Sequence, residues 1–344
     1  MLFYSKTLLA LAIHKKRLTF VANFTSVHYR SMINRTLIRV KALQLLYAYY
    51  KSEAKTLSTL EKELAFSVEK TYDLYFYLLS LAVEITRYAE QRIDARRHKL
   101  RPTSEDLNPN TRFIDNRFVA QLSNNETLNS QLAQKKLSWA DRGDILKELF
   151  LEIEASDFYV EYMSADPTSI DYSADRELWR KIYKRVILAN ENLDDTLEEE
   201  NIYWADDVEV IISFVIKTVK RFDPAAGTQQ ELLPMYKDLD DAEYGRKLLR
   251  YAIEDSEESL HLIDKYSRNW ELERIAFMDT LIMQLALAEL KHFPTIPVNV
   301  TLNEYIEISK SYSTDKSAVF INGVLDKIVQ DLKQENKLIK AVVF

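Results

Sequence analysis

The sequence predicts an all-α protein, and two observations carry this prediction. Gly and Pro number only four and seven in 344 residues, so most of the turn chemistry that a strand-rich fold needs is missing. Apolar residues make up 47% of the chain, which is typical of a globular protein, and they recur at helical spacing over most of its length. The length suits one large domain or two ordinary ones.

The front of the chain is basic and contains the first predicted helix. Residues 1–52 carry nine Lys or Arg and no acid, although the whole chain has a net charge of −7. We expect either a surface that meets phosphates or a solvated charged end. Residues 1–31 are interpreted as a basic extension, with Met32 as an alternative start. From Asn34, a candidate N-cap, apolar residues at helical spacing predict a helix as far as Tyr50.

The middle of the chain is predicted as further helices separated by two polar loops. The loops are RPTSEDLNPNTRFIDN (101–116) and PAAGTQQELLP (224–234), which are rich in turn-forming residues. The predicted helices are two within 57–95, then 118–122, 126–136, 139–163, 176–197 and 206–222, and four more helical patterns from Asp240 onward. The acidic stretch 194–200 is expected to be a helix end and a solvated turn.

Residues for catalysis or metal binding do not form a recognisable site. The four glycines are scattered and cannot form a phosphate-binding loop, and the five histidines lack metal-ligand spacing. The chain has no cysteine, which excludes disulfides and thiolate chemistry and fits a cytoplasmic protein. We therefore expect a protein that binds partners, is not an enzyme, needs no cofactor and is not inserted in a membrane.

Three motifs near the C-terminus and one near the N-terminus carry a family resemblance. The C-terminal motifs are A-L-x-E-L, I-P-V-x-V-x-x-N-E and F-I-N-G-V-L-D-K, all within Trp270–Lys327, and the N-terminal one is A-x-Q-x-L-Y within Asn34–Tyr50. With these motifs the chain resembles the transcription antitermination factor NusB family. The resemblance implies a NusB-like helical bundle formed by 32–59 and 231–344, interrupted by a helical insertion, 60–230, that has no counterpart in the family.

The resemblance also implies a function and a set of contact residues. The family pairs with the ribosomal protein NusE on single-stranded boxA RNA within the RNA polymerase antitermination complex, which promotes ribosomal RNA transcription, and it catalyses no reaction. The positions that match RNA contacts are Arg35, Arg39, Lys316, Ser317, Phe320 and Asn322. Those that match contacts with NusE are Tyr47, Glu273 and Asp279.

Several alternatives remain open at this point. Phe320 is expected to offer a face for base stacking, with Ile321 and Leu325 in the core, but Phe320 and Tyr47 could each be core residues instead. Gly323 fits either a close approach of RNA or close helix packing. The rival function is a non-catalytic helical scaffold that has lost the RNA surface, since Thr36 and Leu37 stand where the family has further bases. A ribosomal RNA methyltransferase is disfavoured because the chain lacks a glycine-bearing cofactor fold.

Overall fold

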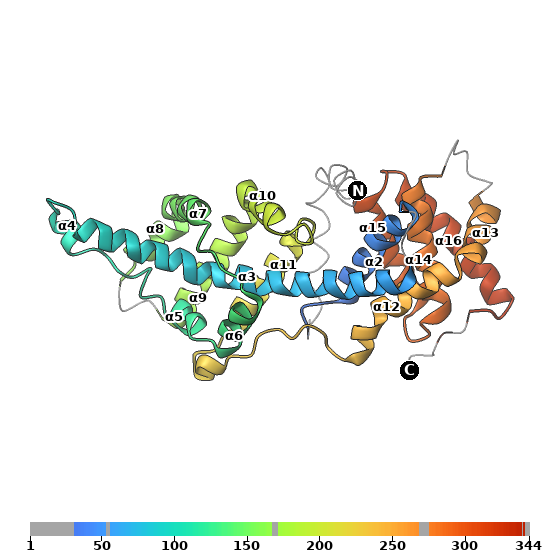
Figure 1. Cartoon of the computed structure of the whole chain (residues 1–344), viewed down its shortest axis with the longest axis horizontal. Helices are drawn as coiled ribbons and strands as arrows, with labels where there is room; N and C mark the ends of the chain where they lie inside the picture. Colours follow the sequence, from blue (N-terminus) through green and yellow to red (C-terminus); the bar gives the residue numbers. More distant parts are fainter. Residues whose placement is uncertain (1–30, 53–55, 167–170, 268–274, 339, 341–344) are drawn as a thin grey trace. The chain divides into compact units, whose positions relative to one another are not determined.

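The computed structural model describes residues 31–52, 56–166, 171–267, 275–338 and 340. Over these residues the chain forms helices and no strand, so the predicted all-α class is confirmed. The chain divides into two compact units (Figure 1). Unit 1 combines the described residues up to Val68 with those from Met235 onward, and unit 2 is Glu69–Pro234.

Unit 1 is a bundle built around one apolar helix. Its helices are α2 (Arg35–Tyr50), the start of α3 (Leu57–Arg97), α12 (Leu239–Glu254), α13 (Ser256–Ser267), α14 (Phe277–His292), α15 (Val298–Tyr312) and α16 (Ser317–Gln334). Helix α14 is apolar on all sides, as expected of a helix surrounded by others, and α2, α12, α13, α15 and α16 all pack against it (Figure 1).

Unit 1 has one helix more than the sequence predicted after Asp240. Helices α12 and α13 are separated by a single residue, Asp255, in a stretch without Pro or Gly. The Asp255 carboxylate accepts a hydrogen bond from Lys291 Nζ at 2.8 Å and lies 2.7 Å from His292 Nε2. Both partners belong to α14, so tertiary contacts hold this break, and a local pattern could not reveal it.

The start of α2 follows the sequence prediction. The Asn34 side chain accepts a hydrogen bond from the Leu37 backbone N–H at 2.8 Å, which confirms Asn34 as the N-cap. Beyond the cap, α2 packs closely on α12: a methyl group added at Gly245 would lie 2.5 Å from Ile38 Cγ2. Glycine therefore allows the backbones of α2 and α12 to approach each other.

Unit 2 is a set of shorter helices with the rest of α3. They are α4 (Ser104–Leu107), α5 (Arg117–Ser123), α6 (Glu126–Lys135), α7 (Gly143–Ala155), α8 (Asp157–Ser164), α9 (Tyr172–Arg185), α10 (Glu191–Glu200) and α11 (Val208–Arg221), with the 3-10 turns η4 (Ile187–Ala189) and η5 (Pro224–Gln229). Its core contains aromatic pairs. The Trp139 ring stacks on Tyr77 with centroids 4.0 Å apart, and its N–H donates to the Tyr77 carbonyl oxygen at 3.0 Å.

Several predicted helix boundaries in unit 2 are wrong, and capping residues explain two of them. Residues 57–95 form one continuous helix, α3, where two were predicted. The helix predicted over 139–163 is divided at Ser156, whose hydroxyl accepts from the Tyr159 N–H. That predicted over 176–197 is divided near Asn190, which caps α10. The acidic stretch 194–200 is consequently helical. Among the described helices, none is long and apolar enough to cross a membrane.

Candidate nucleic-acid interface

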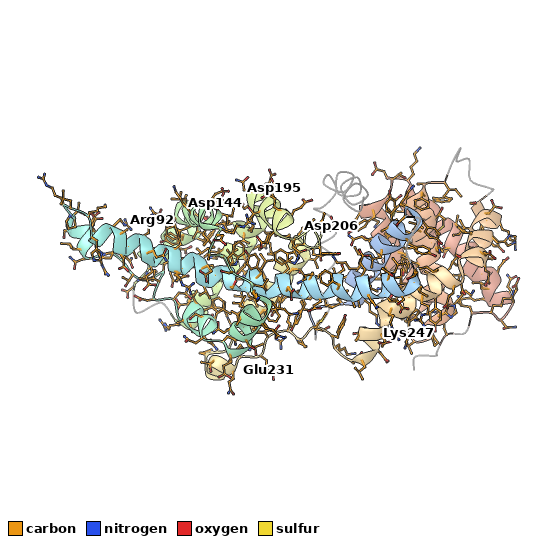
Figure 2. All side chains as sticks on the ribbon, in the orientation of Figure 1. Arg92, Asp144, Asp195, Asp206, Glu231 and Lys247 are labelled. Atoms are coloured by element: carbon orange, nitrogen blue, oxygen red, sulfur yellow. The ribbon has the colours of Figure 1, made fainter. Side chains whose placement is uncertain are left out.

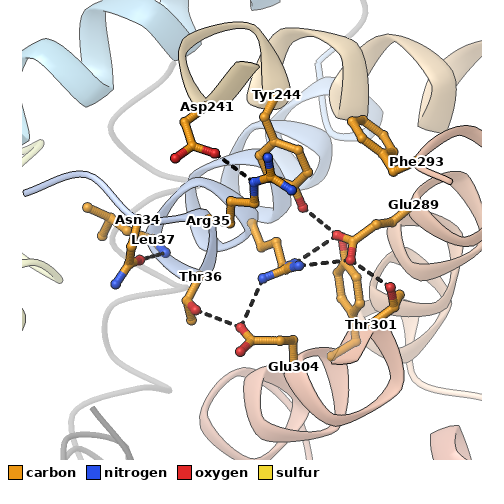
Figure 3. Close-up of polar contacts among 12 residues, drawn as sticks. Asn34, Arg35, Thr36, Leu37, Asp241, Tyr244, Glu289, Phe293, Thr301 and Glu304 are labelled. Carbon is orange, nitrogen blue, oxygen red and sulfur yellow. Dashed lines mark hydrogen bonds and ion pairs between the residues drawn. The ribbon is translucent and has the colours of Figure 1, made fainter. Parts of the chain in front are cut away.

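Arg39 was predicted to contact RNA, but the structure places its side chain inside unit 1. The guanidinium donates to both carboxylate oxygens of Glu289, at 2.7 and 2.8 Å, and to Glu304 at 3.0 Å (Figure 3). Only 3% of the Arg39 side chain is exposed. The expectation of an accessible cation here is therefore wrong, because two carboxylates from α14 and α15 already neutralise it.

Glu289 is the centre of this buried cluster. Its carboxylate also accepts hydrogen bonds from the hydroxyls of Tyr244 and Thr301 (2.8 Å), as Figure 3 shows, and from that of Tyr305 (3.3 Å). Burial alone would raise the pKa of the Glu289 carboxyl, but the charge and hydrogen bonds of Arg39, together with Tyr244 and Thr301, hold it below its usual value. Glu289 thus stays ionised and joins α2, α12, α14 and α15.

Arg35 lies one turn before Arg39 and is partly accessible. Its Nε donates to Asp241 at 2.8 Å, its guanidinium lies 5.0 Å from the centre of the Tyr244 ring, and 33% of its side chain is exposed (Figure 3). Neighbouring Thr36 donates its hydroxyl to Glu304 at 2.6 Å. A phosphate could therefore reach Arg35 only in competition with Asp241.

The predicted RNA contacts at the start of α16 divide into exposed and buried side chains. Lys316 and Asn322 are exposed. Ser317 is buried and donates to Asp279 at 2.9 Å, and Phe320 is only 2% exposed. The expectation that Phe320 offers a free aromatic face is thus not met, because α16 packs against α13, α14 and α15 and buries a wider face than predicted.

Gly323, the glycine within the same motif, is half-buried on α16. Ile321 and Leu325, which were predicted to be core residues, are buried, but so is Val324, which lies one turn after Phe320. The apolar stripe of α16 therefore includes both sets of positions. The exposed part of the F-I-N-G motif is Asn322.

The residues predicted to contact NusE are also divided. Glu273 lies outside the described residues. Asp279 is buried and accepts hydrogen bonds from the hydroxyls of Ser313 and Ser317, so its carboxylate ties the beginning of α14 to the chain entering α16. An exposed acidic patch at Asp279 is therefore not what the structure shows. Tyr47 is half-buried, with its ring centroid 5.8 Å from that of Phe277.

Sequence reasoning missed an aromatic cluster around Tyr47, which we define as Tyr47, Tyr50, Lys51 and Phe277. The Tyr50 and Phe277 centroids are 6.2 Å apart, and Lys51 Nζ lies 4.7 Å from the Phe277 ring centre. Phe277 is 40% exposed and Tyr50 is also exposed. The i, i+3 spacing of Tyr47 and Tyr50 was the available signal, since such residues share a helix face.

The family assignment rests on comparisons with known proteins. A model described as the NusB family matches residues 228–330. The chain is 34% identical over 132 residues to the transcription antitermination protein NusB of Salinibacter ruber, covering 37% of this chain and 82% of that protein. The chain belongs to the NusB family. No solved structure matches the chain.

Two further relatives show how far the likeness extends. The chain is 35% identical over 106 residues to the NusB of Symbiobacterium thermophilum, which is 31% of this chain and 69% of that protein. It is 44% identical over 94 residues to the NusB of Clostridium kluyveri, and this alignment covers 27% of this chain and 60% of that protein. The NusB family model begins at residue 228, so α12 to α16 fall within its range apart from the last residues of α16, whereas α2 lies outside it.

Proposed function

We propose that this protein is an RNA-binding transcription antitermination factor that acts by binding and not by catalysis. The observation that carries the proposal is the alignment with the Salinibacter ruber protein, which is named a transcription antitermination protein. The alignment covers 82% of the length of that protein. No group of three or more potential metal-ligating side chains occurs among the described residues.

The finer proposal is that the protein pairs with NusE on single-stranded boxA RNA and joins the RNA polymerase antitermination complex. On the RNA side, the exposed Lys316 and Asn322 and the partly exposed Arg35 are the members of the predicted set that solvent can reach. On the protein side, the aromatic cluster offers apolar rings beside a cation, and aromatic residues are frequent anchors of protein interfaces.

An RNA mobility shift with purified NusE and boxA RNA tests the RNA part. Lys316→Glu combined with Asn322→Ala should weaken RNA binding about tenfold, because it removes an attractive charge and adds a repulsive one near phosphate. Lys333→Glu, an exposed position in the last turn of α16, is the matched control and should change little. Equal losses in both proteins would contradict a specific surface at the start of α16.

NusE capture by the full chain tests the protein part. Phe277→Ala should weaken NusE binding by about tenfold or more, as expected for an aromatic anchor. The variant should still fold, because the Phe277 side chain is 40% exposed. Val319→Ala, at an exposed apolar position of α16, is the control. If Phe277→Ala binds NusE as tightly as the wild type, the aromatic cluster is not the partner surface.

A second function has one observation in its favour. Both arginines predicted to contact RNA from α2 are paired with carboxylates, Arg39 with Glu289 and Glu304 and Arg35 with Asp241. This pairing suits a helical protein–protein scaffold that has lost the RNA surface. Capture of NusE without salt-dependent RNA binding would favour the scaffold, whereas RNA binding that weakens as salt rises would favour the antitermination factor.

A further inference from the structure

The C-terminal end of α3, in unit 2, carries a concentration of positive charge. We call it the basic tip and define it by Arg92, Arg96, Arg97, Lys99 and Arg101. Asp94 is the one acid between residues 92 and 101, whereas the whole chain has a net charge of −7. A local basic surface on an acidic protein is the usual electrostatic signature of phosphate binding.

Two cations of the basic tip are available to a ligand. Arg92 pairs with Glu154 at 2.9 Å and Lys99 with Asp106 at 3.1 Å, while Arg97 lies 3.7 Å from Asp94. The exposed side chains of Arg96 and Arg101 form no hydrogen bond or ion pair with any described residue. They contrast with Arg39, whose guanidinium is buried and neutralised.

An open pocket adjoins these residues, on the part of α3 that faces α7 and α8, where Arg92 lies (Figure 2). Its volume is about 440 Å³, within the range of roughly 300–1,000 Å³ typical of small-ligand sites. Arg92 and Arg96 line it together with Tyr159, which is half-buried, and with Phe113 and Phe150, which are only 2% and 4% exposed. Cations and a partly exposed aromatic ring at one opening suit a ligand that has both a negative group and a planar ring.

The buried rings of the pocket support Tyr159, which is the ring that a ligand can reach. The Phe113 centroid lies 5.4 Å from Tyr159 and 5.8 Å from Phe150. Burial raises the pKa of the Tyr159 phenol to about 12, so its hydroxyl stays protonated and can donate a hydrogen bond. Asn108 also lines the pocket: its amide nitrogen donates to the Ser104 carbonyl oxygen, and its amide oxygen is the atom that can accept from a ligand. Glu154 is neutralised by Arg92, which leaves Glu105 as the unpaired acid of the lining.

We propose that the basic tip and the adjoining pocket bind single-stranded RNA, with Arg96 and Arg101 on the phosphates and one base against the half-buried ring of Tyr159. This inference rests on the proposed RNA-binding function and deepens it, since it adds an RNA contact at residues of unit 2 that lie outside the range matched by the NusB family model. Single strands are favoured over duplexes because only an unpaired base can enter a pocket and stack on aromatic rings.

Two exposed leucines near the basic tip raise the alternative that this surface binds lipid. Leu100 is 99% exposed within the basic tip, and Leu107 of α4 is also exposed. Apolar side chains beside cations also suit an anionic lipid surface. The pocket with its Tyr159 ring and Asn108 amide argues for a base instead, because a lipid headgroup has no planar ring to stack there. Binding to anionic vesicles is therefore an outcome that the test must separate.

The experiment measures binding of the full-length protein to a fluorescent single-stranded RNA, to its duplex and to anionic phospholipid vesicles. Arg96→Glu with Arg101→Glu should weaken single-stranded RNA binding about tenfold or more. Lys184→Glu with Lys220→Glu makes the same charge change at exposed helix ends of unit 2 and should leave binding nearly unchanged. A photoreactive uridine in the RNA should crosslink to the peptide that contains Tyr159.

The outcomes separate this inference from the function on which it rests. If wild-type protein binds RNA, but the tip variant binds it equally well and crosslinks map only to α16 or α2, the inference fails and the proposed function stands. If wild-type protein binds no RNA, both fail. If the tip variant loses binding to anionic vesicles but binds RNA as well as the wild type does, the basic tip binds a lipid surface and the inference is overturned.

Discussion

Arg39 and Glu289 show how a residue can satisfy a nucleic-acid pattern and still serve the fold. An arginine on the first helix of an RNA-binding family would be read as a phosphate contact, yet here its guanidinium forms a two-pronged ion pair with a carboxylate that is fully buried. Planar guanidinium and carboxylate groups match each other in this geometry. The pair therefore fixes how α2 meets α14.

Breaking this pair should be costly. Arg39→Ala leaves the Glu289 carboxylate buried without its cation, so we expect a loss of about 3–5 kcal/mol in the free energy of unfolding. Arg35→Ala is the matched control: that residue is partly exposed and its ion pair should contribute no more than about 1 kcal/mol. Urea unfolding of both variants measures the difference. Similar losses would mean that the Glu289 site admits water.

The depressed pKa of Glu289 makes part of the stability pH-dependent. Because its folded pKa lies below the ordinary value of 4.5, the stabilisation is fully present above about that pH and is lost as pH falls through the folded pKa. Glu289→Gln removes this titration. The wild type should be more stable than Glu289→Gln at neutral pH, and the difference should shrink below pH 4.5. Thermal unfolding at several pH values measures it, and a pH-independent difference would contradict the assignment.

At the scale of the element, the contact between α2 and α12 depends on a glycine. A methyl group at position 245 would lie 2.5 Å from Ile38 Cγ2 and 3.1 Å from Leu64 Cδ2. The β-branched Ile38 side chain is stiff and cannot easily move aside. Gly245 therefore sets the distance between these two helices.

Gly245→Ala should destabilise the protein even though alanine favours helix. The propensity gain is at most about 1 kcal/mol, while overpacking costs about 1–3 kcal/mol, so we expect a lower melting temperature. Gly143→Ala is the control, because nothing lies within 4 Å of the added methyl group at the start of α7. That variant should be neutral or slightly more stable. Calorimetry of the two variants would contradict this account if Gly245→Ala melted no lower than the wild type.

The helices could be predicted from sequence where a local pattern of apolar and capping residues determines them. They could not be predicted where tertiary contacts determine the end of a helix. The apolar pattern and Asn34 were sufficient for α2, and the all-round apolar run LIMQLALAEL was sufficient for α14. The break at Asp255 depends on Lys291 and His292. Its cause lies far away in sequence, so periodicity alone gave one helix too few.

The same limit applies to the predicted site. Lys316 and Asn322 were predicted as contacts and are accessible, whereas Arg39 and Phe320 are buried. The acid that neutralises Arg39 lies 250 residues later in the chain, and the burial of Phe320 depends on three other helices packed on α16. A motif identifies residue types, but only packing determines which of them solvent can reach.

At the scale of the whole molecule, net charge and available charge differ. The protein has 46 Lys and Arg against 53 Asp and Glu, and many of its described cations are paired with carboxylates. RNA binding therefore depends on the cations that are exposed or only weakly paired. In the proposed surface of unit 1 these are Lys316 and Arg35.

The salt dependence of RNA binding should count these cations. For single strands, the slope of log affinity against log salt is about −0.7 for each neutralised phosphate, so Lys316→Ala with Arg35→Ala should make the slope shallower by about 1.4. Lys184→Ala with Lys220→Ala, which removes the same charge from exposed positions of unit 2, should leave the slope unchanged. Fluorescence anisotropy titrations at several salt concentrations measure it. If the slope is the same in both variants and the wild type, the phosphates are held elsewhere, and the basic tip of α3 becomes the principal electrostatic contact instead of an additional one.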